Sequence, residues 1–316
     1  SVSPAISSSD VASCFRQQFG QILTIAQERC AQGELAFYGG TFTALSPPLV
    51  EEILETVAPW VHAGTFSGIR FSTRPDRMTE NISSRLKDYP IATVELGVQS
   101  FVDEVLALTR RGYTGETAEK AALLVQRHGW RLGLQLMPGL PGDSKSRFLN
   151  SIARAIRFRP DFVRIYPTLV ITGTQLADWY RAGTYHPLSL DEAVSWCVPA
   201  YDALFREHVP IARLGLHPDP ELQKPGTVLA GPYHPAFGYL VRVQWWRDRV
   251  RRRVEANDNL NRGTNLTLRV SARSVSEVIG PGHSNVRYWQ ENLHLNDVGV
   301  KIEDDLLPGQ FKCLFE

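Results

Sequence analysis

A short apolar run that stops at two glycines is the feature that most constrains how this chain can fold. Residues 34–38 are followed by Gly39, Gly40 and Thr41, and apolar residues then recur at helical spacing over 49–61. This order predicts a strand, a tight turn and a helix, which is the opening of a β/α unit. Paired glycines let the backbone approach a ligand closely, and their N–H groups can bind a carboxylate. A simple strand-ending turn is the alternative.

The same pattern recurs along the first half of the chain. Further strands are predicted at 68–72, 93–98, 131–137 and 162–166, with helices at 79–88, 116–128 and 145–157 between them, and 210–216 could add a strand. Strands separated by helices of this length predict a parallel sheet or barrel. Polar and glycine-rich residues gather after each strand, and that end of a parallel sheet is where ligands bind. Ordinary turns would enrich both ends alike, so the pattern favours a binding site.

Composition excludes several classes of protein. The chain has 316 residues, a net charge of +1 and no apolar run near the roughly 20 residues that a membrane helix needs. We therefore expect a cytoplasmic protein with no membrane contact. There is no signal-peptide pattern and no initiator Met, so we expect the chain to begin inside a longer protein. Cys14, Cys30, Cys197 and Cys313 lack any close spacing, which predicts reduced thiols and no metal site.

The second half of the chain is organised differently. Helices are expected at 191–207 and 240–254, and a stretch rich in proline and glycine at 218–237 predicts an ordered loop. A polar run at 255–263 predicts a linker. We therefore expect a barrel with a C-terminal extension at 1–254 and a small α+β module at 264–316.

The motifs at the strand ends resemble, as a set and in this order, those of the radical S-adenosylmethionine superfamily. The resemblance is to the branch of the Elongator catalytic subunit and its shorter stand-alone relatives without an acetyltransferase domain. It covers about residues 9–245, and the matching motifs lie at 37–42, 72–76, 95–100, 110–114, 134–143, 164–168 and 231–237.

The resemblance implies an α/β fold, a partial (β/α)₆ barrel. Proteins of this family hold a 4Fe-4S cluster through a C-x₃-C-x₂-C loop, and the cluster cleaves S-adenosylmethionine to a 5′-deoxyadenosyl radical. This sequence has neither that loop nor the first strand of such a barrel. We expect both to precede Ser1 in a longer parent, which alone would carry the cluster, and we expect this chain by itself to be inactive. A cluster-less relative is the alternative.

Carried over motif by motif, the resemblance also implies a cofactor site. Tyr38, Gly39, Gly40 and Thr41 would lie at the methionyl amino group, and Ser72 and Arg74 beside the ribose or carboxylate. Glu95 and Gln99, the candidate catalytic residues, would face the sugar or the radical carbon. Met137 and Gly139 would flank the adenine, with Tyr166 below the cavity. A solvated rim for Glu95 and Gln99, a salt bridge for Arg74 and a core position for Met137 are the structural alternatives.

Elongator-type enzymes resemble tRNA wobble-uridine modifiers, so the resemblance implies tRNA or another structured RNA as partner, together with an electron donor. Nothing after Asn261 resembles their acetyltransferase domain, so acetyl-coenzyme A is a doubtful co-substrate. A non-catalytic RNA-binding protein on a decayed barrel, and a cluster-independent barrel enzyme that binds S-adenosylmethionine or a phosphate ligand, are the competing hypotheses.

Two features of the C-terminal part could contact RNA. The helix at 240–254 carries Arg242, Arg249 and Arg252 beside Trp245 and Trp246, which offer charge and stacking surfaces. The turn from Gly280 through Gly282 resembles the G-x-x-G loop of a KH module, although His283 replaces the last glycine. A solvated helix face and a plain helix–turn–helix connector are the alternatives.

Overall fold

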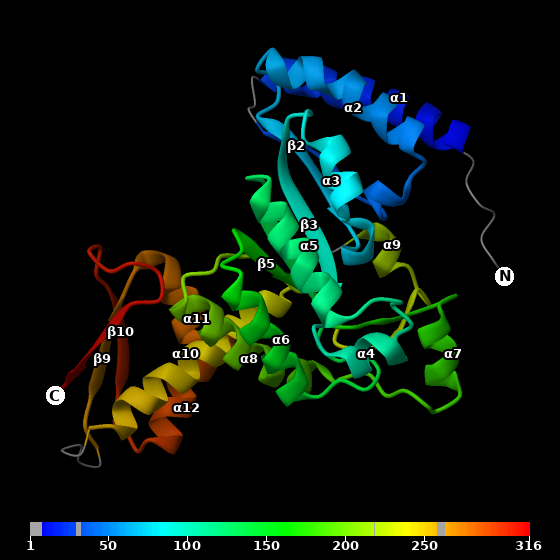
Figure 1. The fold of residues 1–316 in the computed structure, drawn as a ribbon. Helices are drawn as coiled ribbons and strands as arrows, with labels where there is room; N and C mark the ends of the chain where they lie inside the picture. Colours follow the sequence, from blue (N-terminus) through cyan, green and yellow to red (C-terminus); the bar gives the residue numbers. More distant parts are fainter. Residues whose placement is uncertain (1–7, 30–32, 218, 258–262) are drawn as a thin grey trace. The chain divides into compact units, whose positions relative to one another are not determined.

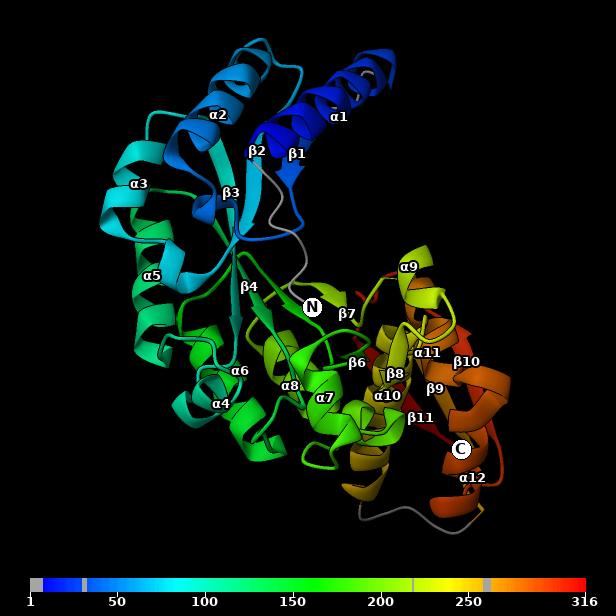
Figure 2. The ribbon, with the colours of Figure 1, turned by 90° about the vertical axis from the view of Figure 1, so that its right-hand side faces the viewer.

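The computed structural model describes residues 8–29, 33–217, 219–257 and 263–316. Two compact units make up the chain, Ser1–Tyr166 with Glu207–Arg213, and Pro167–Arg206 with Leu214–Glu316 (Figures 1 and 2). Cys14, Cys197 and Cys313 are free thiols, whereas the prediction for Cys30 falls outside the described residues. No helix in the described ranges is both long enough and apolar enough to span a membrane.

The first unit is built on a six-stranded sheet with the order β1-β2-β3-β4-β5-β7. Its strands are β1 (Glu34–Phe37), β2 (Gly68–Thr73), β3 (Ile91–Gln99), β4 (Arg131–Leu136), β5 (Phe162–Ile165) and β7 (Ile211–Leu214). Neighbours from β1 to β5 pair in parallel and in chain order. The sheet curls into the partial barrel that the family resemblance implies (Figure 2), so its C-terminal strand ends share one rim.

Helices connect these strands. They are α1 (Ser8–Arg29), α2 (Pro47–His62), α3 (Glu80–Leu86), α4 (Asp103–Leu108), α5 (Gly115–Arg127) and α6 (Lys145–Arg157). Thr79, Thr114 and Ser144 begin α3, α5 and α6, and each side-chain oxygen accepts a hydrogen bond from a backbone N–H three residues later. In Figure 2, α2, α3 and α5 lie along one face of the sheet.

Side chains along the strands alternate between this helix-covered face and the interior of the curl. Ile69 and Phe71 of β2 and Val94 of β3 are fully buried apolar residues. Burial of each of these side chains stabilises the fold by roughly 1.5–3 kcal/mol. Between them stand Arg70 of β2 and Glu95 of β3. Because successive strand residues point to opposite faces, these charged side chains lie on the concave side of the sheet.

The second unit contains a helical part and a small terminal sheet. The helical part holds β6 (Val170–Ile171), α7 (Gln175–Arg181), α8 (Leu190–Arg206), α9 (Pro220–Gln223), β8 (Val228–Ala230) and α10 (Phe237–Glu255). The antiparallel β6–β8 pair and α9 lie partly within the stretch predicted as a loop, because segments of two to four residues are too short for a periodic pattern.

The terminal part runs β9 (Leu266–Val270), α11 (Val275–Ile279), α12 (Ser284–Asn292), β10 (Val298–Ile302) and β11 (Phe311–Phe315). Its sheet has the order β10-β9-β11, with β9 parallel to β10 and antiparallel to β11. Helix α10 packs against α8 and α12 (Figure 1). The prediction that Trp245 and Trp246 offer stacking surfaces is wrong, because each is only 1% exposed.

Candidate functional site

A cavity of about 610 Å³ lies at the C-terminal strand ends of the first unit, within the range of roughly 300–1,000 Å³ that small-molecule sites occupy. Residues predicted from the sequence that line it are Tyr38, Gly39, Gly40, Thr41, Ser72, Arg74, Glu95, Gln99 and Tyr166. Met137 and Gly139 are not among the lining residues. The Met137 N–H donates to the Gln99 carbonyl at 2.9 Å, and the Gly139 N–H donates to Asp143 Oδ2 at 3.0 Å.

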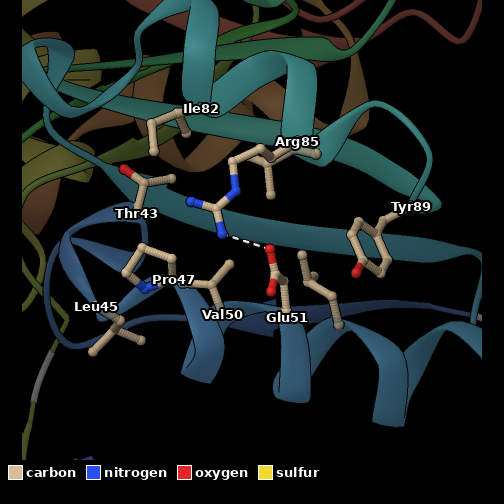
Figure 3. A pocket seen from close by; sticks show the side chains of 10 residues that line it. Thr43, Leu45, Pro47, Val50, Glu51, Ile82, Arg85 and Tyr89 are labelled. Carbon is tan, nitrogen blue, oxygen red and sulfur yellow. Dashed lines mark hydrogen bonds and ion pairs between the residues drawn. The ribbon is translucent and has the colours of Figure 1, made fainter.

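A second hollow in this unit, between α2 and α3, is far smaller (Figure 3). Its volume is about 40 Å³, which is space for a water molecule or two rather than a cofactor. Leu45, Val50 and Ile82 supply apolar walls, and an ion pair between Arg85 and Glu51 crosses it. The rim cavity is therefore the better candidate for a ligand site.

The turn after β1 leaves its backbone open to the rim cavity. Gly39 has a φ of +103°, a conformation that residues with a Cβ rarely adopt. A Cβ added at Gly39 or Gly40 would have no neighbour within 4 Å. The missing side chains therefore expose backbone to the cavity, where it can contact a ligand.

A buried carboxylate organises the wall of the cavity. Glu95 is 4% exposed, and its two oxygens lie 2.6 Å from Arg70 Nε and 2.7 Å from Arg164 Nε. The Tyr38 hydroxyl donates to Glu95 Oε1 at 2.6 Å. Burial, together with the hydrogen bond to Glu95, raises the pKa of Tyr38 to about 12, so the phenol keeps its proton. Two guanidinium groups thus compensate the charge that burial would otherwise penalise.

The ion pairs continue across the concave face. Arg70 Nη1 also lies 3.5 Å from Glu34 Oε2, and the Thr93 hydroxyl donates to Glu34 Oε1 at 2.6 Å. The Arg70 guanidinium stacks over the ring of Phe162, 4.6 Å from its centroid. That ring fits because Gly133 has no side chain: a Cβ there would be 2.3 Å from Phe162 Cζ. Acidic and basic side chains therefore alternate along β1, β2, β3 and β5.

Gln99 reaches the cavity through an irregular strand end. Its φ is +65°, and the pairing of β3 with β4 shifts register between Leu96 and Gln99. Irregularities of this kind re-aim side chains next to functional sites. The Gln99 Oε1 accepts a hydrogen bond from Gln135 Nε2 at 3.1 Å, which fixes the amide at the cavity wall.

Arg111 is a lining residue that the strand-end pattern missed. The neighbouring Arg74 pairs with Asp76 through two hydrogen bonds of 2.9 and 3.0 Å. Arg111 forms no ion pair with any described carboxylate, and its Nε is buried without a hydrogen-bond partner. Burial lowers the pKa of its guanidinium. A partly buried cation without an anion is costly, so Arg111 suits a carboxylate or phosphate of a ligand.

Arg111 was missed because it follows α4 rather than a strand. The signal was present, since Arg111 lies inside the motif at 110–114. Gln135 and Arg164 were also missed as site residues, although both occupy the inward-facing positions of β4 and β5.

Among the described residues, no group of three or more His, Cys, Asp or Glu side chains is arranged to hold a metal ion. The titratable side chains that line the rim cavity instead have ion-pair or hydrogen-bond partners among the described residues, apart from the Arg111 guanidinium.

The arginines predicted to contact RNA have protein partners in the second unit. Arg242 pairs with Glu277, and Arg252 Nη2 lies 3.9 Å from Asp202 Oδ1. Arg249 stacks over Trp245, 4.4 Å from the ring centroid.

Gly280 and Gly282 flank the turn between α11 and α12, with φ values of +74° and +54°. A Cβ at Gly280 would lie 2.5 Å from Ser284 Oγ. The glycine is therefore required by local packing, and RNA contact at this turn stays a prediction.

Comparison with known proteins identifies the family to which this cavity and sheet belong. Residues 17–155 match the Radical SAM superfamily, and residues 160–247 match the Radical_SAM C-terminal domain. The tRNA uridine(34) acetyltransferase of Methanocaldococcus infernus is 38% identical over 125 residues, which are 39% of this chain and 23% of that protein. Elongator complex protein 3 of Mus musculus is 32% identical over 130 residues, 40% of this chain and 24% of that protein. The matched stretch thus spans about a quarter of these relatives.

A solved structure shares the fold. It is the archaeal Methanocaldococcus infernus Elp3 with an N-terminal deletion (1–46), with a TM-score of 0.61 and 24% identity, and the match covers 75% of this chain and 58% of that one. The half-barrel, the strand-end cavity and the two family matches together show that the chain belongs to the radical SAM superfamily.

Proposed function

We propose that the first unit binds S-adenosylmethionine in the rim cavity, as the cofactor-binding core of an enzyme that modifies tRNA. The observation that carries the proposal is Arg111, a cavity-lining guanidinium without a carboxylate partner among the described residues. It lines the same cavity as the open Gly39–Gly40 backbone and the Gln99 amide. These groups match the carboxylate, the amino group and the ribose hydroxyls of one amino acid–nucleoside ligand.

The chain's own residues fit this cofactor in chemistry and in size. Arg111 would bind the methionyl carboxylate, and the turn at 39–41 would bind the amino group through backbone atoms. Gln99 and Ser72 offer hydrogen bonds to the ribose. S-adenosylmethionine supplies a 5′-deoxyadenosyl radical when a reduced 4Fe-4S cluster cleaves it. Glu95, neutralised by Arg70 and Arg164, would hold Tyr38 and Arg164 in position.

The described residues do not fit the cluster itself. They contain no group of metal-ligating side chains, and burial raises the pKa of the Cys197 thiol far above its usual range, which disfavours a thiolate ligand. Radical formation therefore requires cysteine ligands from outside these residues, and we expect the isolated chain not to release 5′-deoxyadenosine.

The proposal that RNA is the substrate rests on the relatives. Their names assign them to tRNA uridine(34) and to the Elongator complex, and the present chain matches a part of each. Acetyl transfer, which the name of the first relative states, is not part of the function proposed for this chain. A non-catalytic RNA-binding protein on the same barrel is the second candidate, favoured by the lack of a metal-ligand group in the described ranges.

A cavity-filling substitution tests the cofactor site. Gly40 lines the rim cavity, and a Cβ added there would meet no protein atom within 4 Å, so Gly40→Val places apolar bulk in the cavity. We expect it to weaken binding of S-adenosylmethionine at least about tenfold, measured by calorimetry on the iron-free chain. Gly20→Val, in α1 and equally free of neighbours, is the matched control. Equal affinities for the two variants would contradict the proposal.

A further inference from the structure

A second sizeable cavity, of about 350 Å³, lies within the second unit. It is formed by the C-terminal ends of α8 and α10 together with β11. Four arginines (Arg206, Arg249, Arg252 and Arg253) and two phenylalanines (Phe205 and Phe311) line it. The function proposed for the rim cavity uses none of them.

The charges of this cavity are not balanced. Among the described residues that line it, Asp202 is the only carboxylate, and it lies 2.6 Å from Arg206 Nη2 and 3.9 Å from Arg252 Nη2. The Trp245 indole N–H also donates to Asp202, at 2.8 Å. No described residue pairs with Arg253, whose side chain is exposed. Four guanidinium groups against one carboxylate leave three positive charges in excess, which favours an anionic ligand.

The floor of the cavity consists of two aromatic rings and a guanidinium group held against them. The guanidinium carbon of Arg249 lies 5.4 Å from the ring centroid of Phe205 and 5.3 Å from that of Phe311. Arg249 Nη1 also donates to the Gly309 carbonyl at 2.5 Å. A Cβ at Gly309 would lie 2.5 Å from Phe205 Cζ, so the glycine lets the backbone close over this ring. Aromatic rings and a planar guanidinium held in this way form a stacking platform.

We propose that this cavity binds one nucleotide of a single-stranded RNA segment. The base would stack on the floor formed by Phe205, Phe311 and Arg249, and the phosphate would pair with Arg252 and Arg253. Both of these arginines are exposed, so a continuous RNA strand can pass over them. The choice of RNA over a free nucleotide rests on the proposed function. The platform differs from the predicted one, because phenylalanines take the place of the buried Trp245 and Trp246.

Paired charge reversals test this assignment. The full chain is titrated with fluorescein-labelled single-stranded oligouridine at physiological salt, and binding is followed by fluorescence anisotropy. We expect Arg252→Glu/Arg253→Glu to weaken binding at least about tenfold and to reduce the salt slope by about 0.7 for each phosphate that is no longer neutralised. The control Arg157→Glu/Arg159→Glu makes the same charge change at exposed positions outside the cavity and should cost less than about threefold. Phe311→Leu keeps an apolar side chain and should cost about fivefold or more.

Three results would overturn the inference. They are equal losses for the two charge-reversal variants, competition by free uridine monophosphate as strong as that by oligouridine, and no binding of oligouridine by the unsubstituted chain. Far-ultraviolet circular dichroism confirms that each variant is folded. Calorimetry with S-adenosylmethionine on the same preparations separates this inference from the proposed function. Retained cofactor binding without RNA binding would reject only the second-unit site, and the reverse result would reject only the rim site.

Discussion

At the scale of single residues, the buried carboxylate of Glu95 is the position on which the cavity wall depends. Removing it would leave Arg164 without its carboxylate partner and Arg70 with only the longer contact to Glu34, at 3.5 Å. We expect Glu95→Ala to lower the free energy of unfolding by about 3–5 kcal/mol, because breaking a buried pair strands the remaining charges. Urea denaturation followed by circular dichroism measures this change.

Glu116→Ala is the control for this prediction. Glu116 pairs with Lys120 on the exposed face of α5, where an ion pair contributes at most about 0.5 kcal/mol. A cost for Glu95→Ala as small as that of the control would show that the network around Glu95 does not stabilise the sheet.

Asp143 makes the free energy of unfolding of the first unit depend on pH. Burial raises the pKa of this carboxyl to about 6, although the N–H groups of Ser144 and Gly139 oppose the shift. The folded chain therefore binds more protons than the unfolded chain between about pH 4 and about pH 6, and the free energy of unfolding contributed by Asp143 falls as pH rises through this window.

Asp143→Asn removes this titration. We expect the stability of the unsubstituted chain relative to Asp143→Asn to be greatest near pH 4 and to decline up to about pH 7. Urea denaturation of both proteins across this range measures the difference. A difference that stays constant, or that grows with pH, would be inconsistent with a raised pKa.

At the scale of elements, Gly97 of β3 and Gly133 of β4 make room for different kinds of neighbouring group. A Cβ at Gly133 would lie 2.3 Å from the Phe162 ring, whereas a Cβ at Gly97 would lie 2.8 Å from the amide nitrogen of Gln99. A ring packed in the sheet cannot move easily, but a side-chain amide can rotate away.

We therefore expect Gly133→Ala to cost about 1–3 kcal/mol of folding stability through overpacking. Gly97→Ala should leave stability nearly unchanged and weaken binding of S-adenosylmethionine, because it displaces Gln99. Thermal denaturation and calorimetry on the two variants separate these effects. If the two variants unfolded at the same temperature and bound S-adenosylmethionine with the same affinity, the different roles assigned to Gly133 and Gly97 would be refuted.

The elements also show what the sequence could and could not predict. Strands β1 to β5 were predictable because buried apolar residues alternate along them and polar residues follow each strand. The register shift before Gln99 was not, since it depends on how β4 pairs with β3. Strand β11 lacks a distinctive pattern, and Arg111 enters the cavity from a helix–loop segment rather than from a strand end.

At the scale of the whole molecule, the two units have different chemical characters. The rim cavity of the first unit combines open backbone, a fixed amide and one guanidinium without a carboxylate partner among the described residues. The second unit presents a cationic cavity with an aromatic floor. A cofactor site and an RNA site in separate units would suit an enzyme that acts on a large substrate.

This division of tasks predicts that the two ligands bind without requiring each other. We expect the dissociation constant of oligouridine to change less than about twofold when S-adenosylmethionine is saturating, because the two sets of lining residues have no member in common. Anisotropy titrations with and without the cofactor measure the ratio. A change of tenfold or more would show coupling between the sites.

The central claim is that Arg111 receives the carboxylate of S-adenosylmethionine, and a comparison of two ligands tests it most directly. Calorimetry on the iron-free chain and on Arg111→Ala measures the affinity for S-adenosylmethionine and for 5′-methylthioadenosine, which lacks the carboxylate. We predict that Arg111→Ala weakens binding of S-adenosylmethionine at least about tenfold, as expected for a lost charge-assisted pair, and leaves 5′-methylthioadenosine within about twofold. Equal losses for both ligands, or no binding of either by the unsubstituted chain, would contradict the claim.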